Sequence, residues 1–218
     1  MAKAKKKHCY DYPRPMVTVD CVALRVVDSA LEILLVKRGT APFKGFWALP
    51  GGFVGMKETL EAAAIRELVE ETGVRNLSLL FQHGVYGDPG RDPRGRVITV
   101  AFMGVVAKGG GKSKAGDEIQ ESRWFSVEKI PGKLACDHAN IICDAMMRLA
   151  AHGKTSALLI AFLGDAFSAG ELRKVLEAVY GVRIDPDDFL TPFIERKVVR
   201  RMNSGKFKFL GWHTARGR

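Results

Sequence analysis

The stretch of residues 51–74, GGFVGMKETLEAAAIRELVEETGV, constrains this chain more than any other. Its middle, residues 57–72, is rich in Ala, Leu and Glu and contains neither Pro nor Gly, so it is predicted to be helical. Gly73 follows at the position where helices usually end in a left-handed cap. Residues 49–52, Leu-Pro-Gly-Gly, lead into the helix as a turn in which backbone carbonyls can closely approach an ion.

Acidic side chains gather on one face of this predicted helix. Glu67, Glu70 and Glu71 are neighbours there, because side chains three and four residues apart lie next to each other. Carboxylates crowded in this way repel one another unless a cation lies among them. Oxygen-only ligands suit a hard ion such as Mg²⁺ or Mn²⁺ better than zinc. Arg66, four residues before Glu70, is placed to form an ion pair with it.

The same stretch resembles the Nudix box, Gx5Ex7REUxEExGU with U apolar, and every fixed position of that motif is filled. A surface helix with a solvated acidic face would explain the glutamates, but it would not explain Gly52, Glu58 and Arg66 at those offsets. The resemblance implies attack of water on a phosphorus of a nucleoside diphosphate derivative, assisted by a divalent ion. A box that folds and binds metal in a protein whose main task is regulation is the alternative.

The resemblance also assigns roles to individual residues. The expected catalytic and metal-site residues are Gly51 through its carbonyl, Glu58, Arg66, Glu67, Glu70 and Glu71. Gly51, Glu67, Glu70 and Glu71 match metal ligands, Arg66 orients the carboxylates, and Glu58 matches a structural or ancillary metal position. The general base stays open between Glu67 and three acidic residues of a late loop, Asp117, Glu118 and Glu121.

Length and charge bound the rest of the chain. With 218 residues it is long for one domain and suits one domain plus a small second one. The net charge of +10 indicates an anionic partner, either a nucleotide or a nucleic acid, although a basic surface without such a partner is the simpler interpretation. The four cysteines form no C-x-x-C pair and the longest apolar run, residues 157–163, is too short to span a membrane. We therefore expect a cytoplasmic protein without a membrane partner.

Residues 13–152 are predicted to form an α/β domain after a basic flexible tail of residues 1–12. Strands are expected at residues 16–27, 31–37, 45–50, 77–86, 97–107 and 121–127, with a closing helix at residues 137–151. Strands on both sides of the box helix, followed by a second helix, predict a mixed sheet between helices. This agrees with the α/β/α sandwich that the Nudix resemblance implies.

The segment GDPGRDPRGR, residues 87–96, is predicted to be a loop that carries three arginines. Loops of this composition often carry function, and arginine is suited to bidentate contact with phosphate. The expected substrate-binding residues are therefore Arg38, Arg91, Arg94 and Arg96. A plain charged turn explains the composition equally well.

Composition changes after residue 152, and residues 153–218 are predicted to be a small winged-helix-like domain. An apolar helix is expected at 155–163, and a second helix runs from the capping-box pair Ser168 and Glu171 to Gly181. A third helix opens at Asp185-Pro186, and Pro192 should kink it or restart it with Thr191 as a new cap.

A basic hairpin is predicted at the end of this region. Its arms are residues 198–201 and 206–210, although the first arm fits an extension of the preceding helix as well. The candidate DNA-binding residues are Lys197, Arg200, Arg201, Lys206 and Lys208. A helical appendage used for dimerisation is the competing interpretation.

Taken together, the two halves resemble one Nudix group, the ADP-ribose pyrophosphatases and the related NrtR-like transcriptional regulators of NAD metabolism. The resemblance covers most of residues 10–215. It implies Mg²⁺- or Mn²⁺-dependent hydrolysis of ADP-ribose or a related nucleoside diphosphate derivative, together with binding to double-stranded DNA and a homodimeric state. The alternative is a regulator that senses ADP-ribose-like nucleotides instead of hydrolysing them.

Overall fold

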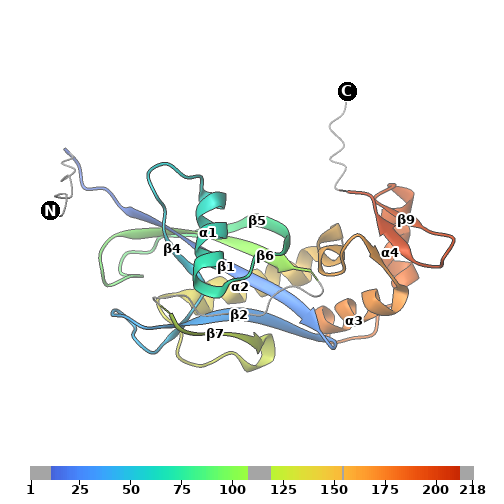
Figure 1. Cartoon of the computed structure of the whole chain (residues 1–218), viewed down its shortest axis with the longest axis horizontal. Coiled ribbons are helices and arrows are strands. Elements are labelled where there is room, and N and C mark those ends of the chain that lie inside the picture. Colours follow the sequence, from blue (N-terminus) through green and yellow to red (C-terminus); the bar gives the residue numbers. More distant parts are fainter. Residues whose placement is uncertain (1–10, 108–118, 154, 212–218) are drawn as a thin grey trace.

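The computed structural model describes residues 11–107, 119–153 and 155–211 (Figure 1). Its elements are β1 (Met16–Val27), β2 (Ala30–Arg38), β3 (Trp47–Ala48), β4 (Gly51–Phe53), α1 (Leu60–Thr72), β5 (Leu77–Tyr86), β6 (Val97–Val106), β7 (Ile119–Ser126), η1 (Val127–Lys129), α2 (His138–Gly153), η2 (Ala157–Phe162), β8 (Ala166–Phe167), α3 (Ala169–Tyr180), α4 (Pro186–Glu195), β9 (Val199–Arg201) and β10 (Phe207–Phe209). The basic tail up to residue 10 and the candidate bases Asp117 and Glu118 lie outside the described residues. Within those described ranges, no helix combines the length and apolarity that a bilayer crossing requires.

A mixed sheet of seven strands forms the centre of the molecule, with the order β3-β2-β1-β6-β5. β1 pairs in parallel with β6 and antiparallel with β2, while β4 joins the sheet through β1 and β7 joins it through β2. The middle of β1 and almost all of β6 are buried, as expected for strands with both faces covered.

Alternate residues of β1 point to opposite faces of this sheet, and each face is covered by one helix. Cys21 and Ala23 pack in one cluster with Leu68 of α1. Val22 and Leu24 belong to a different cluster, which contains the apolar face of α2. Figure 1 shows α1 and α2 separated by the sheet. This arrangement confirms the expected α/β/α sandwich.

Helix α1 begins and ends where local chemistry dictates. The Thr59 hydroxyl caps it by accepting a hydrogen bond from the backbone N–H of Ala62 at 3.1 Å. Gly73 ends it with a left-handed φ of 72°, and its N–H donates to the carbonyl of Val69. The predicted left-handed cap is confirmed, whereas the helix starts three residues later than the predicted Lys57 because Thr59 is the cap.

The C-terminal region contains the elements of a winged helix in order: η2, β8, the helices α3 and α4, and a hairpin of β9 and β10. The three short strands form a sheet with the order β8-β10-β9. The predicted capping box is present, because Ser168 and Glu171 each bond the other's backbone. Gly181 ends α3 with a φ of 66°, and Asp185 caps α4 with Pro186 in its first turn.

Three sequence predictions need correction. Pro192 does not restart the third helix: α4 continues as one helix through this residue, and the Thr191 hydroxyl donates to the carbonyl of Asp187 at 2.9 Å instead of capping. The apolar segment expected as a helix at residues 155–163 is a 3-10 helix, η2. The expected Pro-Gly-Gly turn contains a strand, β4, whose Gly51 pairs with Asp20 of β1.

The hydrophobic core runs without interruption from the central sheet into the C-terminal region. One cluster joins Val22 of β1 and Ile141 of α2 to Leu172 of α3, Phe193 of α4 and Phe207 of β10. Figure 1 shows α3 next to the hairpin of β1 and β2, with α4 and β9 further out. The domain boundary at residues 152–153 stays a prediction, and the core does not divide there.

Candidate active site

The guanidinium of Arg66 organises the acidic face of α1. Its Nε and one terminal nitrogen donate to both oxygens of Glu58, at 3.0 and 2.7 Å. Its other terminal nitrogen donates to Glu67 at 2.7 Å and to Glu70 at 3.0 Å. The predicted ion pair between Arg66 and Glu70 is therefore present. The hydrogen bonds from Arg66 lower the pKa of Glu58 to about 2, so that Glu58 remains a carboxylate at neutral pH.

Glu71 and Glu67 lie deeper in the site than Glu70. The backbone N–H of Gly51 donates to Glu71 at 2.9 Å and links the box helix to β4. Desolvation raises the pKa of Glu71 to about 8, and the nearby charges of Glu67 and Asp20 add to the shift. Burial also raises the pKa of Glu67, in spite of its hydrogen bond with Arg66. Negative charge at this point of the site is thus incompletely balanced by the protein itself.

The donor set fits a hard divalent cation. Glu67, Glu70, Glu71 and the Gly51 carbonyl offer only oxygen atoms, and a cation would balance the charge on Glu67 and Glu71. Within the described residues, no three His, Cys, Asp or Glu side chains are grouped closely enough to hold a metal ion. Glu67 and Glu70 point instead to the guanidinium of Arg66, so their side chains would have to turn toward an ion to bind it.

Two glycines allow the strand before α1 to lie against its neighbours. A Cβ atom at Gly52 would lie 2.4 Å from an oxygen of Glu67, and one at Gly51 would lie 2.2 Å from the carbonyl oxygen of Val19. Both distances are shorter than any real carbon contact, so a side chain at either position would displace β4 or the carboxylate. This explains why the motif requires glycine at position 52.

A pocket lies beside Glu71, between β1, β4, the loop of residues 87–96 and the start of α2. Its lining includes Asp20, Arg38, Gly51, Gly52, Glu71, Arg91, Asp92, Arg94, Cys136 and His138. The pocket therefore combines the buried end of the carboxylate set with three of the four arginines predicted to bind substrate. Arg96 is not part of this lining, and its guanidinium donates to the carbonyl of Gly87.

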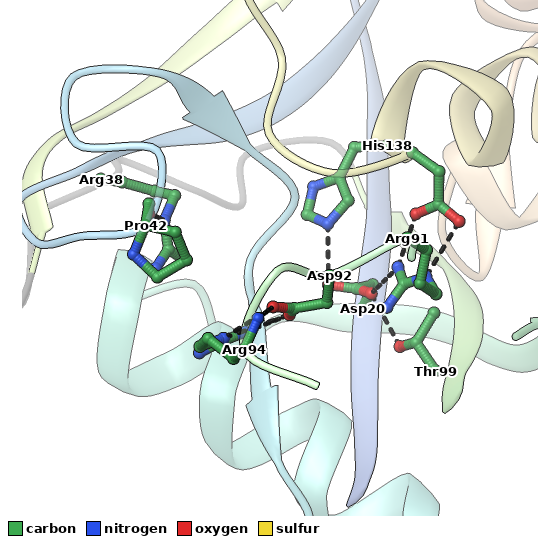
Figure 2. A network of polar contacts seen from close by, with 9 residues as sticks. Asp20, Arg38, Pro42, Arg91, Asp92, Arg94, Thr99 and His138 are labelled. Atoms are coloured by element: carbon green, nitrogen blue, oxygen red, sulfur yellow. Dashed lines mark hydrogen bonds and ion pairs between the residues drawn. The ribbon is translucent and has the colours of Figure 1, made fainter. Parts of the chain in front are cut away.

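The four arginines have different environments. Arg38 donates to the carbonyl of Pro42 at 2.9 Å. Arg91 is almost fully buried, and both its Nε and a terminal nitrogen donate to Asp137, at 2.9 and 2.6 Å. Arg94 is 37% exposed and pairs with Asp92 (Figure 2). Its guanidinium also lies 5.0 Å over the ring of Phe53. Arg38 and Arg94 are thus available at the pocket, whereas Arg91 is enclosed by carboxylates.

Asp20 and His138 are among the pocket residues that the sequence prediction missed. Asp20 accepts a hydrogen bond from the Thr99 hydroxyl at 2.7 Å, and one of its oxygens lies 3.5 Å from Nε2 of His138 (Figure 2). Nδ1 of His138 accepts a hydrogen bond from the Leu49 N–H at 2.8 Å. Burial lowers the pKa of His138, which keeps the ring neutral. Asp20 could have been found as the one carboxylate in an apolar strand, whereas His138 had no signal in the sequence.

The remaining predicted residues lie outside the pocket. Glu121 is on β7 and pairs with Arg123. Lys197, Arg200, Arg201, Lys206 and Lys208 are all exposed on or beside the hairpin of β9 and β10. Arg200 and Lys208 are cross-strand neighbours, which concentrates positive charge on this wing. Arg201 also pairs with Asp187 of α4 at 2.5 Å.

The sandwich, the box helix and the adjoining pocket define a Nudix hydrolase. The family model for the NUDIX domain matches residues 14–145, and the chain belongs to this family. Members of the family generally use divalent metal ions, and the oxygen donors described above fit such an ion.

Named relatives extend the match to both halves of the chain. The chain is 47% identical over 137 residues to the ADP-ribose pyrophosphatase of Methanocaldococcus jannaschii, covering 62% of this chain and 75% of that protein. It is 33% identical over 199 residues to the ADPR responsive transcriptional repressor NtrR of Acinetobacter baylyi, covering 90% of this chain and 79% of that protein. It also resembles the crystal structure of Shewanella oneidensis NrtR complexed with a 27mer DNA, with 27% identity and a TM-score of 0.74 over 88% of this chain and 91% of that chain. This last likeness extends into the C-terminal region, because it covers 88% of this chain.

Proposed function

We propose that this protein hydrolyses ADP-ribose, or a closely related nucleoside diphosphate derivative, with Mg²⁺ or Mn²⁺ as the divalent ion. The observation that carries this proposal is the complete carboxylate set of α1, held by Arg66 and continued by Glu71 into a pocket with arginines. The choice of ADP-ribose is supported by the relative from Methanocaldococcus jannaschii, an ADP-ribose pyrophosphatase, which shares 47% identity with this chain.

Different side chains of the site have different proposed roles in the reaction. A bound ion, held by Glu67, Glu70, Glu71 and the Gly51 carbonyl, would balance phosphate charge and lower the pKa of water. Arg66 holds Glu67 and Glu70 in place, and Glu58 holds Arg66 from the other side. Arg38 and Arg94 at the pocket are the proposed phosphate contacts, whereas Arg91 is buried against Asp137 and Arg96 does not line the pocket.

The reaction breaks the phosphoanhydride bond between the two phosphates. A water oxygen bonds to one phosphorus, the bridging oxygen leaves with the other phosphate, and ADP-ribose yields AMP and ribose 5-phosphate. The water proton passes to a carboxylate base. Glu67 is the base that we propose, because burial raises its pKa and it lies on the reacting face of α1. Glu121 stays the alternative within the described residues.

A substrate panel tests the proposal. The full-length protein is incubated with Mg²⁺ or Mn²⁺ and with ADP-ribose, NAD, diadenosine polyphosphates or nucleoside triphosphates, and the products are separated by chromatography. We expect AMP and ribose 5-phosphate from ADP-ribose and no turnover in the presence of EDTA. Lack of turnover of every compound with either ion would refute the hydrolase function.

A second function is favoured by the exposed basic wing. We propose that the C-terminal region binds double-stranded DNA and that a nucleotide in the pocket alters this binding. Lys197, Arg200, Lys206 and Lys208 are all exposed, and the relative from Acinetobacter baylyi is an ADPR responsive repressor. A gel shift with genomic fragments at low salt tests the binding, and absence of a retarded band at any salt would contradict it.

The homodimer that we propose follows from the proposed binding to DNA. A homodimer would present two wings to a two-fold symmetric site in DNA. Light scattering at micromolar protein concentration should give the mass of two chains, and the mass of one chain would refute the dimer.

The location that we propose is the cytoplasm. The cysteines in the described part of the chain, Cys21, Cys136 and Cys143, are free, which supports a reducing compartment.

A further inference from the structure

The loop of residues 87–96 is fastened to the start of α2 by a single side chain. Nε and a terminal nitrogen of Arg91 donate to the two oxygens of Asp137, at 2.9 and 2.6 Å. Asp137 directly precedes α2, and its carbonyl accepts the N–H of Asn140 at 2.9 Å. Both oxygens of its side chain are therefore engaged by the loop. This bidentate pair joins residues that are 46 positions apart in the sequence.

The pair lies in a closed environment. The side chain of Arg91 is 3% exposed and that of Asp137 is 18% exposed. Asp20 approaches the same guanidinium at 3.7 Å while it accepts the hydroxyl of Thr99 (Figure 2). Arg91 thus lies between two carboxylates, and its release would leave them close together without their shared cation. Breaking a buried pair of this kind is strongly unfavourable.

The residues after Arg91 connect it to the pocket. Asp92 is almost fully buried and accepts both the N–H of Arg94 at 2.9 Å and its guanidinium at 2.6 Å. The guanidinium of Arg94 lies 5.0 Å over the ring of Phe53, and the carbonyl of Phe53 accepts a hydrogen bond from Arg66 of the box helix at 3.1 Å. The loop therefore reaches from α2, where Arg91 binds Asp137, to the carboxylate site near Arg66.

We propose that Arg91 is a positioning residue and that Asp137 holds it, so that together they place Arg94 at the mouth of the pocket for the phosphates of the substrate. Arg91 acts through the loop and does not itself touch the nucleotide. This inference rests on the proposed hydrolysis of ADP-ribose and assigns Arg91 a role different from direct phosphate contact. The positioning role and direct phosphate contact by Arg91 predict opposite effects on KM when the charge of Asp137 is removed.

The variant Asp137→Asn separates them. It retains the shape of the side chain and removes its charge. If Arg91 positions the loop, KM for ADP-ribose should rise roughly tenfold while kcat stays within about twofold, since the loop contributes to binding more than to the carboxylate chemistry. If Arg91 contacts phosphate directly, loss of Asp137 would release its guanidinium, and KM would stay the same or fall. Asp137→Glu should restore KM to within about threefold of the wild type, because a carboxylate is again within reach.

The control is Glu32→Gln, which makes the same change in another ion pair. Glu32 of β2 pairs with Arg25 of β1 at 2.7 Å with 23% of its side chain exposed, and it does not line the pocket. KM and kcat of this variant should equal those of the wild type. An equal rise of KM in Glu32→Gln and Asp137→Asn would overturn the proposal, because it would reflect general destabilisation.

Limited trypsin digestion gives a readout that needs no substrate. The loop contains three trypsin sites, Arg91, Arg94 and Arg96, and Asp137→Asn leaves all of them in place. Cleavage within residues 87–96 should be roughly tenfold faster in Asp137→Asn than in the wild type or Glu32→Gln, because it follows the open population of the loop. This comparison remains decisive even if ADP-ribose is not hydrolysed, so the two proposals fail separately.

Two further results would overturn the positioning role. The first is a KM at or below that of the wild type in Asp137→Asn, and the second is an unchanged rate of loop cleavage. Should Asp137→Asn fail to fold, Arg91→Lys replaces it, because lysine retains the charge and the trypsin site but cannot bridge both oxygens of Asp137. Wild-type KM and wild-type cleavage in Arg91→Lys would equally refute the proposal.

Discussion

At the scale of single residues, the carboxylates of the box helix differ mainly in how far they are removed from water. Glu70 has 58% of its side chain exposed, whereas that of Glu67 is 14% exposed. Glu58 accepts hydrogen bonds from Arg66 and from the N–H of Gly55, which fits an orienting role. Exposure therefore decides which of these residues can be changed without disturbing the fold.

Replacing Glu70 by Gln should lower the rate of ADP-ribose hydrolysis at saturating Mg²⁺ by at least about 100-fold, because a proposed oxygen ligand loses its charge. The melting temperature should stay within about 2 °C of the wild type, since exposed substitutions change stability little. The control is Glu61→Gln, an exposed carboxylate in the first turn of the same helix. Wild-type turnover by Glu70→Gln would show that the ligand assignment is wrong.

His138 should make stability depend on pH. Burial lowers its pKa from the ordinary value of 6.5, and its Nδ1 must remain unprotonated to accept the N–H of Leu49. Below pH 6.5 the histidine is therefore protonated in the unfolded chain while it is still neutral in the folded chain. The contribution of His138 to stability is thus present above pH 6.5 and is lost as the pH falls. The free energy of unfolding, measured with urea, should fall between pH 7 and pH 5. The fall should be less steep in His138→Gln, by up to about 1.4 kcal/mol per pH unit. Equal slopes in both proteins would contradict this assignment.

At the scale of elements, α4 and the wing carry opposite charges. The exposed side chains of α4 include Asp187, Asp188 and Glu195, whereas the wing presents Arg200, Lys206 and Lys208. Asp187 is also paired with Arg201 of β9. If α4 lies in the major groove as expected for a winged helix, its carboxylates oppose the phosphates, and the wing must supply most of the attraction to DNA.

Replacing Asp187 by Asn should therefore strengthen DNA binding. The change removes a negative charge from α4 and makes the guanidinium of Arg201 available to a phosphate. Fluorescence anisotropy with a labelled duplex should show a Kd lowered several-fold at low salt and a salt dependence that is steeper by about one unit. Asp28→Asn is the matched control, because it makes the same change of charge at the exposed turn between β1 and β2. Weaker binding by Asp187→Asn would show that this carboxylate contacts a base instead.

At the scale of the whole molecule, α2 connects the two proposed functions. Its first residue, His138, contacts the segment that leads to Gly51, and its last residue, Gly153, lies against Tyr180 of α3, where an added Cβ atom would be 2.5 Å from the tyrosine oxygen. The helix is thus in contact with both the nucleotide pocket and the winged-helix region. This contact gives a physical route for communication between them.

If the two sites communicate, their coupling must be reciprocal. ADP-ribose should change the affinity for DNA by some factor, and DNA should change the affinity for ADP-ribose by the same factor. Anisotropy with labelled DNA, with and without ADP-ribose, and calorimetry with ADP-ribose, with and without DNA, measure the two factors. EDTA prevents hydrolysis during both titrations. Two factors that differ beyond error would mean that the ligands do not act on one equilibrium.

The parts of this structure that could be predicted are those whose cause is local. The cap at Gly73, the capping box at Ser168 and the strand MVTVDCVALRVV all depend on residues within a few positions of one another. The role of Arg66 followed from its offset to Glu70, because helix geometry converts that offset into a contact.

The parts that escaped prediction depend on contacts between distant segments. Nothing near Arg91 in the sequence indicates that its partner is Asp137, and nothing near Leu49 indicates His138, which is 89 positions away. The expected phosphate contact of Arg91 therefore rested on its residue type and on the composition of its loop, and it stays a prediction. β8 has only two residues, and it exists because β10 offers it an edge. Such pairings follow from the arrangement of the whole chain.

The shared hydrophobic core has a consequence for how the protein can be divided. All proposed hydrolytic residues precede Gly153, so a fragment ending there would contain the complete catalytic set. Yet apolar side chains of β1, β2 and α2 that are packed in one cluster with Leu172 and Phe193 would then face water. Uncovered apolar surface of this kind makes a protein adhere to itself. The fragment should therefore be less soluble than the full-length protein, because the C-terminal region, besides its proposed binding of DNA, covers this apolar surface.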